Sequence, residues 1–319
     1  MRVVVFGAGA IGSFLGARLF RAGHQVVLVG RPDHVAAIQR DGLQIEGPTE
    51  EVYRVPAATE LPSKDRSEIV FLCVKSPDLA EAGGTLGGAL RPPVPVVTLG
   101  NGLGIERRLA ESLRASGWVS PEQWIVRGTN SYGVTLLGPG RIRHAGEGEI
   151  LLPRTSPSVP LTVLDTVDQV LREAGFRVRR AEQLDRELWR KALINASINP
   201  ITADQAIENG ALAKEPYRGQ AERLLREAQA VAAAEGFPFS NEEADRELWK
   251  VVRATARNRS SMLQDLDRGR RTEIEAISGE ILAAGTRHGL DLPNTRRAIE
   301  RIDRREAQGP DRPRRPERA

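Results

Sequence analysis

A lysine and two asparagines share one face of a predicted helix in the segment "LWRKALINASINP". Lys191, Asn195 and Asn199 follow one another at intervals of four residues, which stacks their side chains on a single helix face. Asparagine is a mediocre interior helix residue because its amide competes for backbone hydrogen bonds. A lysine ammonium is protonated at neutral pH and can donate a proton to a carbonyl oxygen under reduction, while amides bind polar small molecules. The pattern indicates a general acid with binding groups beside it; a solvated polar face is the alternative.

A glycine-rich turn stands between an apolar run and a predicted helix at the start of the chain. The segment "GAGAIG" has the pattern G-x-G-x-x-G. Between a strand and a helix, the first glycine permits a tight turn, the second lets the backbone approach a pyrophosphate, and the third allows close helix packing. A tight turn without a ligand is the alternative. The candidate cofactor-binding residues of this turn are Gly7, Ala8, Gly9, Ala10, Ile11 and Gly12.

The end of the second predicted strand favours NADP over NAD. An NAD site usually has an acidic residue there, which accepts a hydrogen bond from the ribose 2′-hydroxyl. This chain has Gly30 and Arg31 instead, and a guanidinium suits a 2′-phosphate. Two alternatives stay open. Arg31 is a solvated loop residue, or Asp33, two residues further along, serves the ribose of NAD.

A second polar cluster lies in the segment "NRSSMLQDLDRGRRTEIEAISGE". Ser261 with Gln264, and Thr272 with Glu275, have the spacing of a capping box. The second box places Glu273 in a first helical turn, where acidic residues are favoured by the helix dipole. On spacing alone, both pairs are interpreted as helix caps.

Alternating strand and helix patterns over about residues 1–181 predict a doubly wound, mainly parallel sheet of the Rossmann type. The predicted strands cover 2–6, 24–30, 68–75, 94–102 and 176–182, and the predicted helices cover 10–23, 104–116 and 161–175. Residues 124–152 differ, because glycines break them into short β-like pieces. This pattern predicts an antiparallel extension on the edge of the sheet.

The pattern changes at about Asp185, from where the segments are helical in period with no strand signal. We therefore expect an all-helical second domain over residues 182–305. The tail "EAQGPDRPRRPERA", residues 306–319, has proline and arginine but no apolar face, which predicts disorder. Two domains also fit the length of 319 residues.

The composition excludes several classes of protein. A net charge of +4 and an aromatic content of 4% argue against nucleic-acid binding. The single cysteine, Cys73, lies in an apolar run and is predicted to be a core residue. A chain with one cysteine cannot form an internal disulfide. The N-terminus lacks the pattern of a signal peptide, and no run of 18 apolar residues occurs. We therefore expect a cytoplasmic protein without a membrane span.

The chain resembles the ketopantoate reductases (2-dehydropantoate 2-reductases) from Met1 to about Gly289. The resemblance is carried by "GAGAIG", "GR" at 30–31, "CVK" at 73–75, "GNG" at 100–102, "KALINASINPITA" at 191–203 and "NRSSMLQD" with "RRTEIEAISGEI" at 258–281. The glycine turn is shared by many families. The lysine–asparagine–asparagine–proline and Ser-Ser-Met-x-Gln-Asp segments together are much more specific.

The resemblance implies roles for the polar residues. Lys191 would be the general acid, and Glu273 would orient its ammonium and contact the substrate hydroxyl. The implied substrate-binding residues are Asn195, Asn199, Asn258 and Ser261. Lys75 and Asn101 would touch both the nicotinamide ribose and the substrate. Arginine in place of Lys191 would hold its proton too firmly, which explains a lysine in a chain where arginine is the habitual cation.

The implied activity is NADPH-dependent reduction of 2-dehydropantoate to (R)-pantoate, in a cleft between the two domains at the carboxyl ends of the parallel strands. The expected partner is a small-molecule 2-keto acid, with a homodimer as an option; nucleic acid, membrane and metal are not expected. Two alternatives remain. One is a reductase of another branched 2-keto acid or other hydroxy acid, and the other is a non-catalytic NADP-binding sensor.

Overall fold

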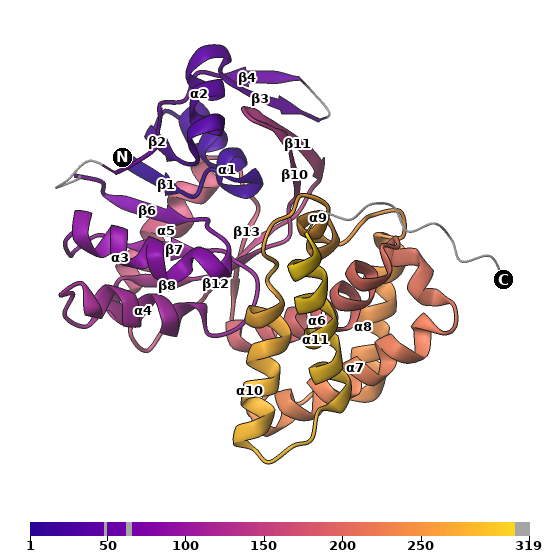
Figure 1. Ribbon diagram of the computed structural model, residues 1–319. Coiled ribbons are helices and arrows are strands. Elements are labelled where there is room, and N and C mark those ends of the chain that lie inside the picture. The colour runs from indigo at the N-terminus through magenta and orange to yellow at the C-terminus, as the bar shows by residue number, and fades with distance from the viewer. Residues whose placement is uncertain (48–49, 62–65, 310–319) are drawn as a thin grey trace. The chain divides into compact units, whose positions relative to one another are not determined.

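The computed structural model describes residues 1–47, 50–61 and 66–309 (Figure 1). The chain clusters into two compact units. Unit 1 comprises Met1–Gly100 and Ile105–Leu184, and unit 2 comprises Asn101–Gly104 and the chain from Asp185 onward. The segment Asn101–Gly104 thus packs with unit 2, although its chain neighbours on both sides belong to unit 1.

Six parallel strands among the described residues form the central sheet of unit 1, in the order β5–β2–β1–β6–β7–β8. The strands are β5 (Ala57–Ala58), β2 (Gln25–Val29), β1 (Arg2–Phe6), β6 (Ile69–Leu72), β7 (Val96–Thr98) and β8 (Ile125–Arg127). Every residue of β6 and β7 is buried. A continuous buried run is typical of a parallel strand that is covered on both faces.

Helices pack against both faces of this sheet, which confirms the predicted doubly wound fold. Val3 and Val5 of β1 share a core with Leu15 and Leu164, whereas Val4 belongs to a second core. Neighbouring residues of a strand point to opposite faces, so the two cores lie on opposite sides of the sheet. The helices of unit 1 are α1 (Ala10–Arg21), α2 (Pro32–Asp41), η1 (Ser76–Asp78), α3 (Leu79–Ala89), α4 (Ile105–Ala115), η2 (Pro121–Gln123) and α5 (Leu161–Glu173).

A separate four-stranded sheet corrects the prediction for residues 124–152. Within that range, β8 is a parallel strand of the central sheet, and the antiparallel pair that follows it does not extend that sheet. The strands of the second sheet are β10 (Gly133–Gly138), β11 (Arg141–Gly146), β3 (Leu43–Glu46) and β4 (Glu51–Tyr53). The turn between β10 and β11 is anchored on α2, because the Gly140 N–H donates to Nδ1 of buried His34 at 2.9 Å. This contact places β11 beside β3, the strand that follows α2.

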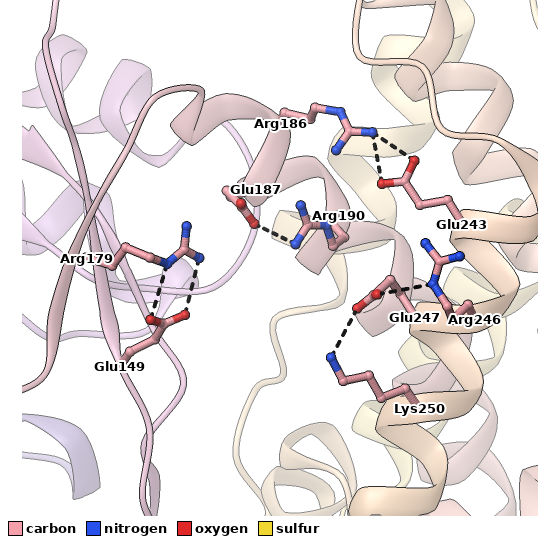
Figure 2. A network of polar contacts seen from close by, with 9 residues as sticks. All are labelled: Glu149, Arg179, Arg186, Glu187, Arg190, Glu243, Arg246, Glu247 and Lys250. Atoms are coloured by element: carbon pink, nitrogen blue, oxygen red, sulfur yellow. Dashed lines mark hydrogen bonds and ion pairs between the residues drawn. The ribbon is translucent and has the colours of Figure 1, made fainter.

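A third sheet of unit 1 has three strands and contains the strand predicted at 176–182. In it, β12 (Ile150–Pro153) pairs with β9 (Thr129–Asn130) and in parallel with β13 (Val178–Ala181). Arg179 of β13 pairs with Glu149 at 3.2 Å, next to the start of β12 (Figure 2). The strand predicted at 176–182 exists, but it belongs to this sheet and not to the central one.

The described residues of unit 2 form helices and turns and no strand, as predicted. Its helices are α6 (Leu184–Gln205), η3 (Asn209–Ala213), α7 (Tyr217–Ala234), α8 (Asn241–Ala254), α9 (Ser261–Asp267), the π-helix η4 (Glu275–Gly279), α10 (Glu280–Arg287) and α11 (Pro293–Gln308). Apolar residues of α6, α7, α8 and α10 share one core. Across the described chain, no helix has the length and apolar character needed to span a bilayer.

Helix α11 corrects the predicted start of the tail. It continues through Gln308, beyond the predicted boundary after residue 305. Glu306 ties this last turn to the rest of unit 2, because its Oε1 accepts the Thr272 N–H at 2.8 Å. The remainder of the predicted disordered tail, residues 310–319, lies outside the described residues.

Candidate functional site

The glycine turn joins β1 to α1 in unit 1, as its pattern predicts. Gly7 has a φ of +103°, and a Cβ there would lie 2.6 Å from the backbone N of Val74. A Cβ on Gly12 would lie 2.2 Å from the carbonyl O of Gly7. Both positions therefore exclude any side chain. At Gly9, no atom lies within 4 Å of where a Cβ would be, so its backbone faces open space.

The N-terminus of α1 fits the pyrophosphate of a dinucleotide. Its N-cap residue, Gly9, provides no side-chain cap, and the first turn holds no acidic residue. The first amides of a helix have no acceptor within the helix, and the helix dipole favours an anion at this end. Open space at Gly9 and uncapped amides are what a bound pyrophosphate requires.

Arg31 lies at the end of β2 as the N-cap residue of α2, and its side chain is 74% exposed. Gly30 before it packs tightly, since a Cβ there would lie 2.8 Å from the Cβ of Ala8. Asp33 lies in the first turn of α2. An acidic side chain that was not predicted from the sequence lies near Arg31. Oδ2 of Asp78, from η1, is 4.0 Å from Nη2 of Arg31. No local pattern signals this pair, because η1 follows a different strand.

Lys75 is the N-cap residue of η1 and is half-buried. Its carbonyl accepts the Asp78 N–H at 2.9 Å, so Lys75 and the acid near Arg31 belong to one tight turn after β6. Cys73, two residues before it, packs against the hydrophobic core, and burial raises the pKa of its thiol to about 12. The thiol therefore stays protonated at neutral pH and behaves as a small hydrophobic group.

Helix α6 of unit 2 carries Lys191, Asn195 and Asn199. Lys191 and Asn195 are half-buried, and Asn199 is buried with 6% of its surface exposed. A buried amide argues against the alternative of a solvated polar face. Ile194 and Ile198 belong to the core of unit 2 and hold the helix in place. The helix continues through its internal proline to Gln205.

Glu273 is held by a residue 172 positions away in the sequence. Nδ2 of Asn101 donates to its Oε2 at 3.1 Å, and both residues belong to unit 2. Glu273 precedes the helical turn, and the Thr272 hydroxyl accepts the N–H of Ile274 at 3.2 Å. The predicted capping box of Thr272 with Glu275 is therefore wrong, because the hydroxyl bonds an amide two residues on.

The capping box predicted for Ser261 with Gln264 is also wrong. Ser260 is the N-cap residue of α9, and its Oγ accepts the Leu263 N–H at 3.2 Å. The Thr202 hydroxyl of α6 donates to the same Oγ at 2.8 Å. Two adjacent serines leave the register of a cap ambiguous in the sequence. The contact between α6 and α9 makes Ser260 the cap. Ser261 is then the exposed first residue of α9.

Asn258 is exposed in the segment before α9. Its carbonyl accepts the Asn209 N–H at 3.0 Å, and Nδ2 of Asn209 donates to the Thr255 hydroxyl at 2.9 Å. These bonds fix the backbone around Asn258 against η3. The predicted residues Asn101, Lys191, Asn195, Asn199, Asn258, Ser261 and Glu273 therefore all belong to unit 2, whereas the glycine turn, Arg31 and Lys75 belong to unit 1.

Ion pairs fix the first turns of α6 beside α8. Arg186 donates to both carboxylate oxygens of Glu243 at 2.9 Å, and Glu187 pairs with Arg190 at 2.9 Å (Figure 2). The Arg186 guanidinium also stacks over the ring of Phe239, 4.4 Å from its centroid. Both bonds come from one nitrogen, Nη2 of Arg186, and they are charge-assisted, which makes them stronger than bonds between neutral groups. The network holds the helix turn that leads into Lys191. Within the described residues, no group of three or more His, Cys, Asp or Glu side chains could hold a metal ion.

Comparison with known proteins agrees with this fold. The family described as ketopantoate reductase PanE/ApbA matches residues 3–157, and its C-terminal part matches residues 183–306. A 2-dehydropantoate 2-reductase of Archaeoglobus fulgidus is 34% identical over 291 residues, covering 91% of this chain and 92% of that protein.

Two solved structures are similar in fold. The PanE/ApbA family ketopantoate reductase from Ralstonia eutropha JMP134 superposes with a TM-score of 0.85 at 30% identity, covering 97% of this chain and 99% of that one. D-mandelate dehydrogenase, solved with NADH and anilino(oxo)acetate, has a TM-score of 0.87 at 22% identity, with coverage of 97% and 99%.

The Rossmann-type unit with its glycine turn, followed by a helical unit, defines an NAD(P)-dependent oxidoreductase. The chain belongs to the ketopantoate reductase PanE/ApbA family.

Proposed function

We propose that this chain reduces 2-dehydropantoate to (R)-pantoate with NADPH, on the route to pantothenate and coenzyme A. The observation that carries the proposal is the composition of unit 2: a lysine and two amides on one face of α6, in the same unit as a carboxylate held by Asn101. Residues 1–181 would bind the dinucleotide and residues 182–305 the keto acid. The proposal places the enzyme in the cytoplasm and is compatible with a homodimer.

Arg31 supports NADPH as the preferred dinucleotide. Its exposed guanidinium at the end of β2 can form charge-assisted hydrogen bonds with a 2′-phosphate, while the glycine turn binds the pyrophosphate. Lys75, half-buried after β6 on the other side of β1, would contact the nicotinamide ribose and the substrate. Asp78 weakens the preference, because its carboxylate competes for Arg31 and repels a second anion.

Lys191 acts as the general acid in this proposal. When bound, NADPH would supply the hydride that the carbonyl carbon of the keto acid requires. The Lys191 ammonium stabilises the negative charge that develops on the carbonyl oxygen and donates its proton there, which yields the alcohol. Glu273 orients the ammonium and accepts a hydrogen bond from the substrate hydroxyl. The Asn101 amide fixes one of its carboxylate oxygens.

The remaining polar groups of unit 2 would bind the ends of the substrate. The amides of Asn195 and Asn199, on the same helix face as the lysine, suit the hydroxyl and carboxylate groups. Ser261 and Asn258 come from the segment that the Thr202–Ser260 hydrogen bond ties to α6. A small, polar, singly charged substrate matches this set of neutral donors better than a nucleotide or a peptide.

A reductase of another 2-keto acid is the second candidate. The structural likeness to D-mandelate dehydrogenase, whose substrate is aromatic, shows that the fold also serves other hydroxy acids. A site built to bond a substrate hydroxyl with asparagine and glutamate side chains favours ketopantoate, because an analogue without that hydroxyl leaves them unpaired.

The test is NADPH oxidation with three substrates: ketopantoate, the analogue that lacks its hydroxyl, and an aryl 2-keto acid. NADH serves as the cofactor control. We expect kcat/KM for ketopantoate to exceed that of the analogue by about 10²-fold or more. A preference for the aryl acid would support the second candidate. NADPH binding without turnover of any of the three acids would indicate a sensor and contradict the proposal.

A further inference from the structure

A short loop after β7 docks on the helical turn that follows Glu273. The Leu103 N–H donates to the carbonyl O of Ala276 at 3.0 Å, and Nδ2 of Asn101 donates to Oε2 of Glu273 at 3.1 Å. These bonds explain why Asn101–Gly104 clusters with unit 2 while its chain neighbours cluster with unit 1. The loop is thus fixed at two points, one residue on either side of Gly102.

Gly102 makes the closest approach between this loop and the turn. It has a φ of +95°, a conformation that other residues rarely adopt. A Cβ at this position would lie 2.4 Å from the carbonyl O of Ala276 and 2.9 Å from its carbonyl carbon. Both atoms belong to the backbone, so they cannot rotate away as a flexible side chain would. Any side chain at residue 102 must push the loop off the turn.

The turn that receives the loop is the π-helix η4, which starts two residues after Glu273. The Ile277 N–H donates to the carbonyl O of Glu273 at 3.1 Å. Glu273 and Ala276 therefore belong to the same hydrogen-bonded turn. Single π-helical turns occur frequently at functional sites, because the extra residue re-aims side chains and backbone groups. Here the turn presents the Ala276 carbonyl to the loop.

We propose that Gly102 is a positioning residue for the catalytic carboxylate. By allowing the backbone of the loop to contact Ala276, it sets the separation at which Asn101 bonds Glu273. The carboxylate is then held by a side-chain donor on a fixed backbone. This inference rests on the proposed function, in which Glu273 orients the Lys191 ammonium.

The first experiment compares Gly102→Ala with Gly236→Ala. Gly236 is the matched control, because it also belongs to unit 2 and has a φ of +90°, but no atom lies within 4 Å of its Cβ position. Both variants carry a similar backbone strain. We expect Gly102→Ala to lower kcat for the keto acid about 10²-fold, since a displacement of about 1 Å costs this much. Gly236→Ala should keep the wild-type kcat. A Gly102→Ala enzyme with kcat within about twofold of the control would overturn the proposal.

A double-mutant cycle separates this role from a merely structural one. If Gly102 acts through Asn101, then Gly102→Ala should lower kcat by less than about threefold in the background of Asn101→Ala. If Gly102→Ala lowers kcat by the same factor in the wild type and in Asn101→Ala, Gly102 does not act through Asn101, and the proposal is contradicted.

Hydrogen exchange tests the docking without any turnover. In the wild type, the peptide that contains Leu103 should be protected, and in Gly102→Ala it should exchange much faster. Exchange of the wild-type peptide at the rate of an unstructured loop would refute the docking, even if the variant does not fold. Protection in a wild-type protein that fails to reduce ketopantoate would support the docking and count against the proposed function alone.

Discussion

Arg31 and Asp78 oppose each other across 4.0 Å beyond the carboxyl ends of β2 and β6. Both side chains are exposed, so their attraction is about 1 kcal/mol at this distance in water. A 2′-phosphate placed against Arg31 must displace this partner and meets the negative charge of Asp78. A 2′-hydroxyl, by contrast, can donate a hydrogen bond to that carboxylate. The pair should therefore limit the proposed preference for NADPH over NADH.

Asp78→Asn should tighten NADPH binding about fivefold, because about 1 kcal/mol of competition and repulsion is removed. The Kd for NADH should stay equal or rise. Arg31→Ala should weaken NADPH binding roughly 10–150-fold, the value of a charge-assisted hydrogen bond, and affect NADH much less. Fluorescence titration of each variant with NADPH and with NADH measures these Kd values. Asp33→Asn is the control; if it alone shifts the preference, Asp33 and not Asp78 is the acid that contacts the ribose.

Lys191→Ala should lower kcat by about 10²–10⁴-fold, because general acid catalysis is lost, while the Kd for NADPH stays within about twofold. Glu273→Ala should cost less, since this residue orients the ammonium and does not supply the proton. Lys214→Ala removes an exposed lysine at the end of η3 in the same unit and should leave kcat unchanged. Reduction of ketopantoate by Lys191→Ala within about tenfold of the wild-type rate would rule out this acid and turn attention to Lys75.

Ser260→Ala should lower stability by about 1 kcal/mol, because α9 loses its N-cap. It should also raise KM for the keto acid, because Ser261 follows directly. Ser240→Ala removes the N-cap of α8, where the Glu243 N–H donates at 3.1 Å, and should cost similar stability without changing KM. Equal KM values for the two variants would show that Ser260 is a cap without influence on substrate binding.

Removal of the last residues should have different effects on either side of Glu306. A chain that ends at Arg305 loses the acceptor of the Thr272 N–H, next to Glu273, and should lose about 1–2 kcal/mol of stability together with part of its kcat. A chain that ends at Gly309 should retain the melting temperature and turnover of the full-length protein. Thermal denaturation and steady-state rates of both truncations check this. Identical behaviour of the two chains would mean that the Glu306 contact contributes nothing.

Glu275→Gln should stabilise the protein at pH 7. Burial, and after it the negative charges of Asp303, Glu306 and Glu280, raise the pKa of the Glu275 carboxyl. A raised pKa in the folded state means that the folded protein binds this proton more tightly, so stability falls as the pH rises from the unfolded value through the folded one. Glutamine removes the charge and should add about 0.5 kcal/mol at pH 7, a small gain because solvent screens the group.

That gain should shrink as the pH is lowered toward 4, where the wild-type carboxyl is itself protonated. Melting temperatures of Glu275→Gln and the wild type across this pH range measure the difference. A gain that persists unchanged at pH 4 would point to packing and not to charge.

The sequence by itself determined the features that depend on local spacing. The glycine turn lies between a strand and a helix, and Lys191, Asn195 and Asn199 share a face, because helical periodicity fixes which side chains align along one element. The division into a strand–helix part and a helical part follows from the same periodicities. The family resemblance added expected roles for these residues, but not their contacts.

Only the tertiary structure decided which separate segments meet. Asp78 lies near Arg31 because β2 and β6 flank β1 in the central sheet, and Asn101 reaches Glu273 across 172 residues because its loop docks on η4. Ser260, and not Ser261, caps α9 because Thr202 of another helix donates to it. Contacts of this kind depend on how whole elements pack, and the spacing of residues within one element carries no information about its neighbours.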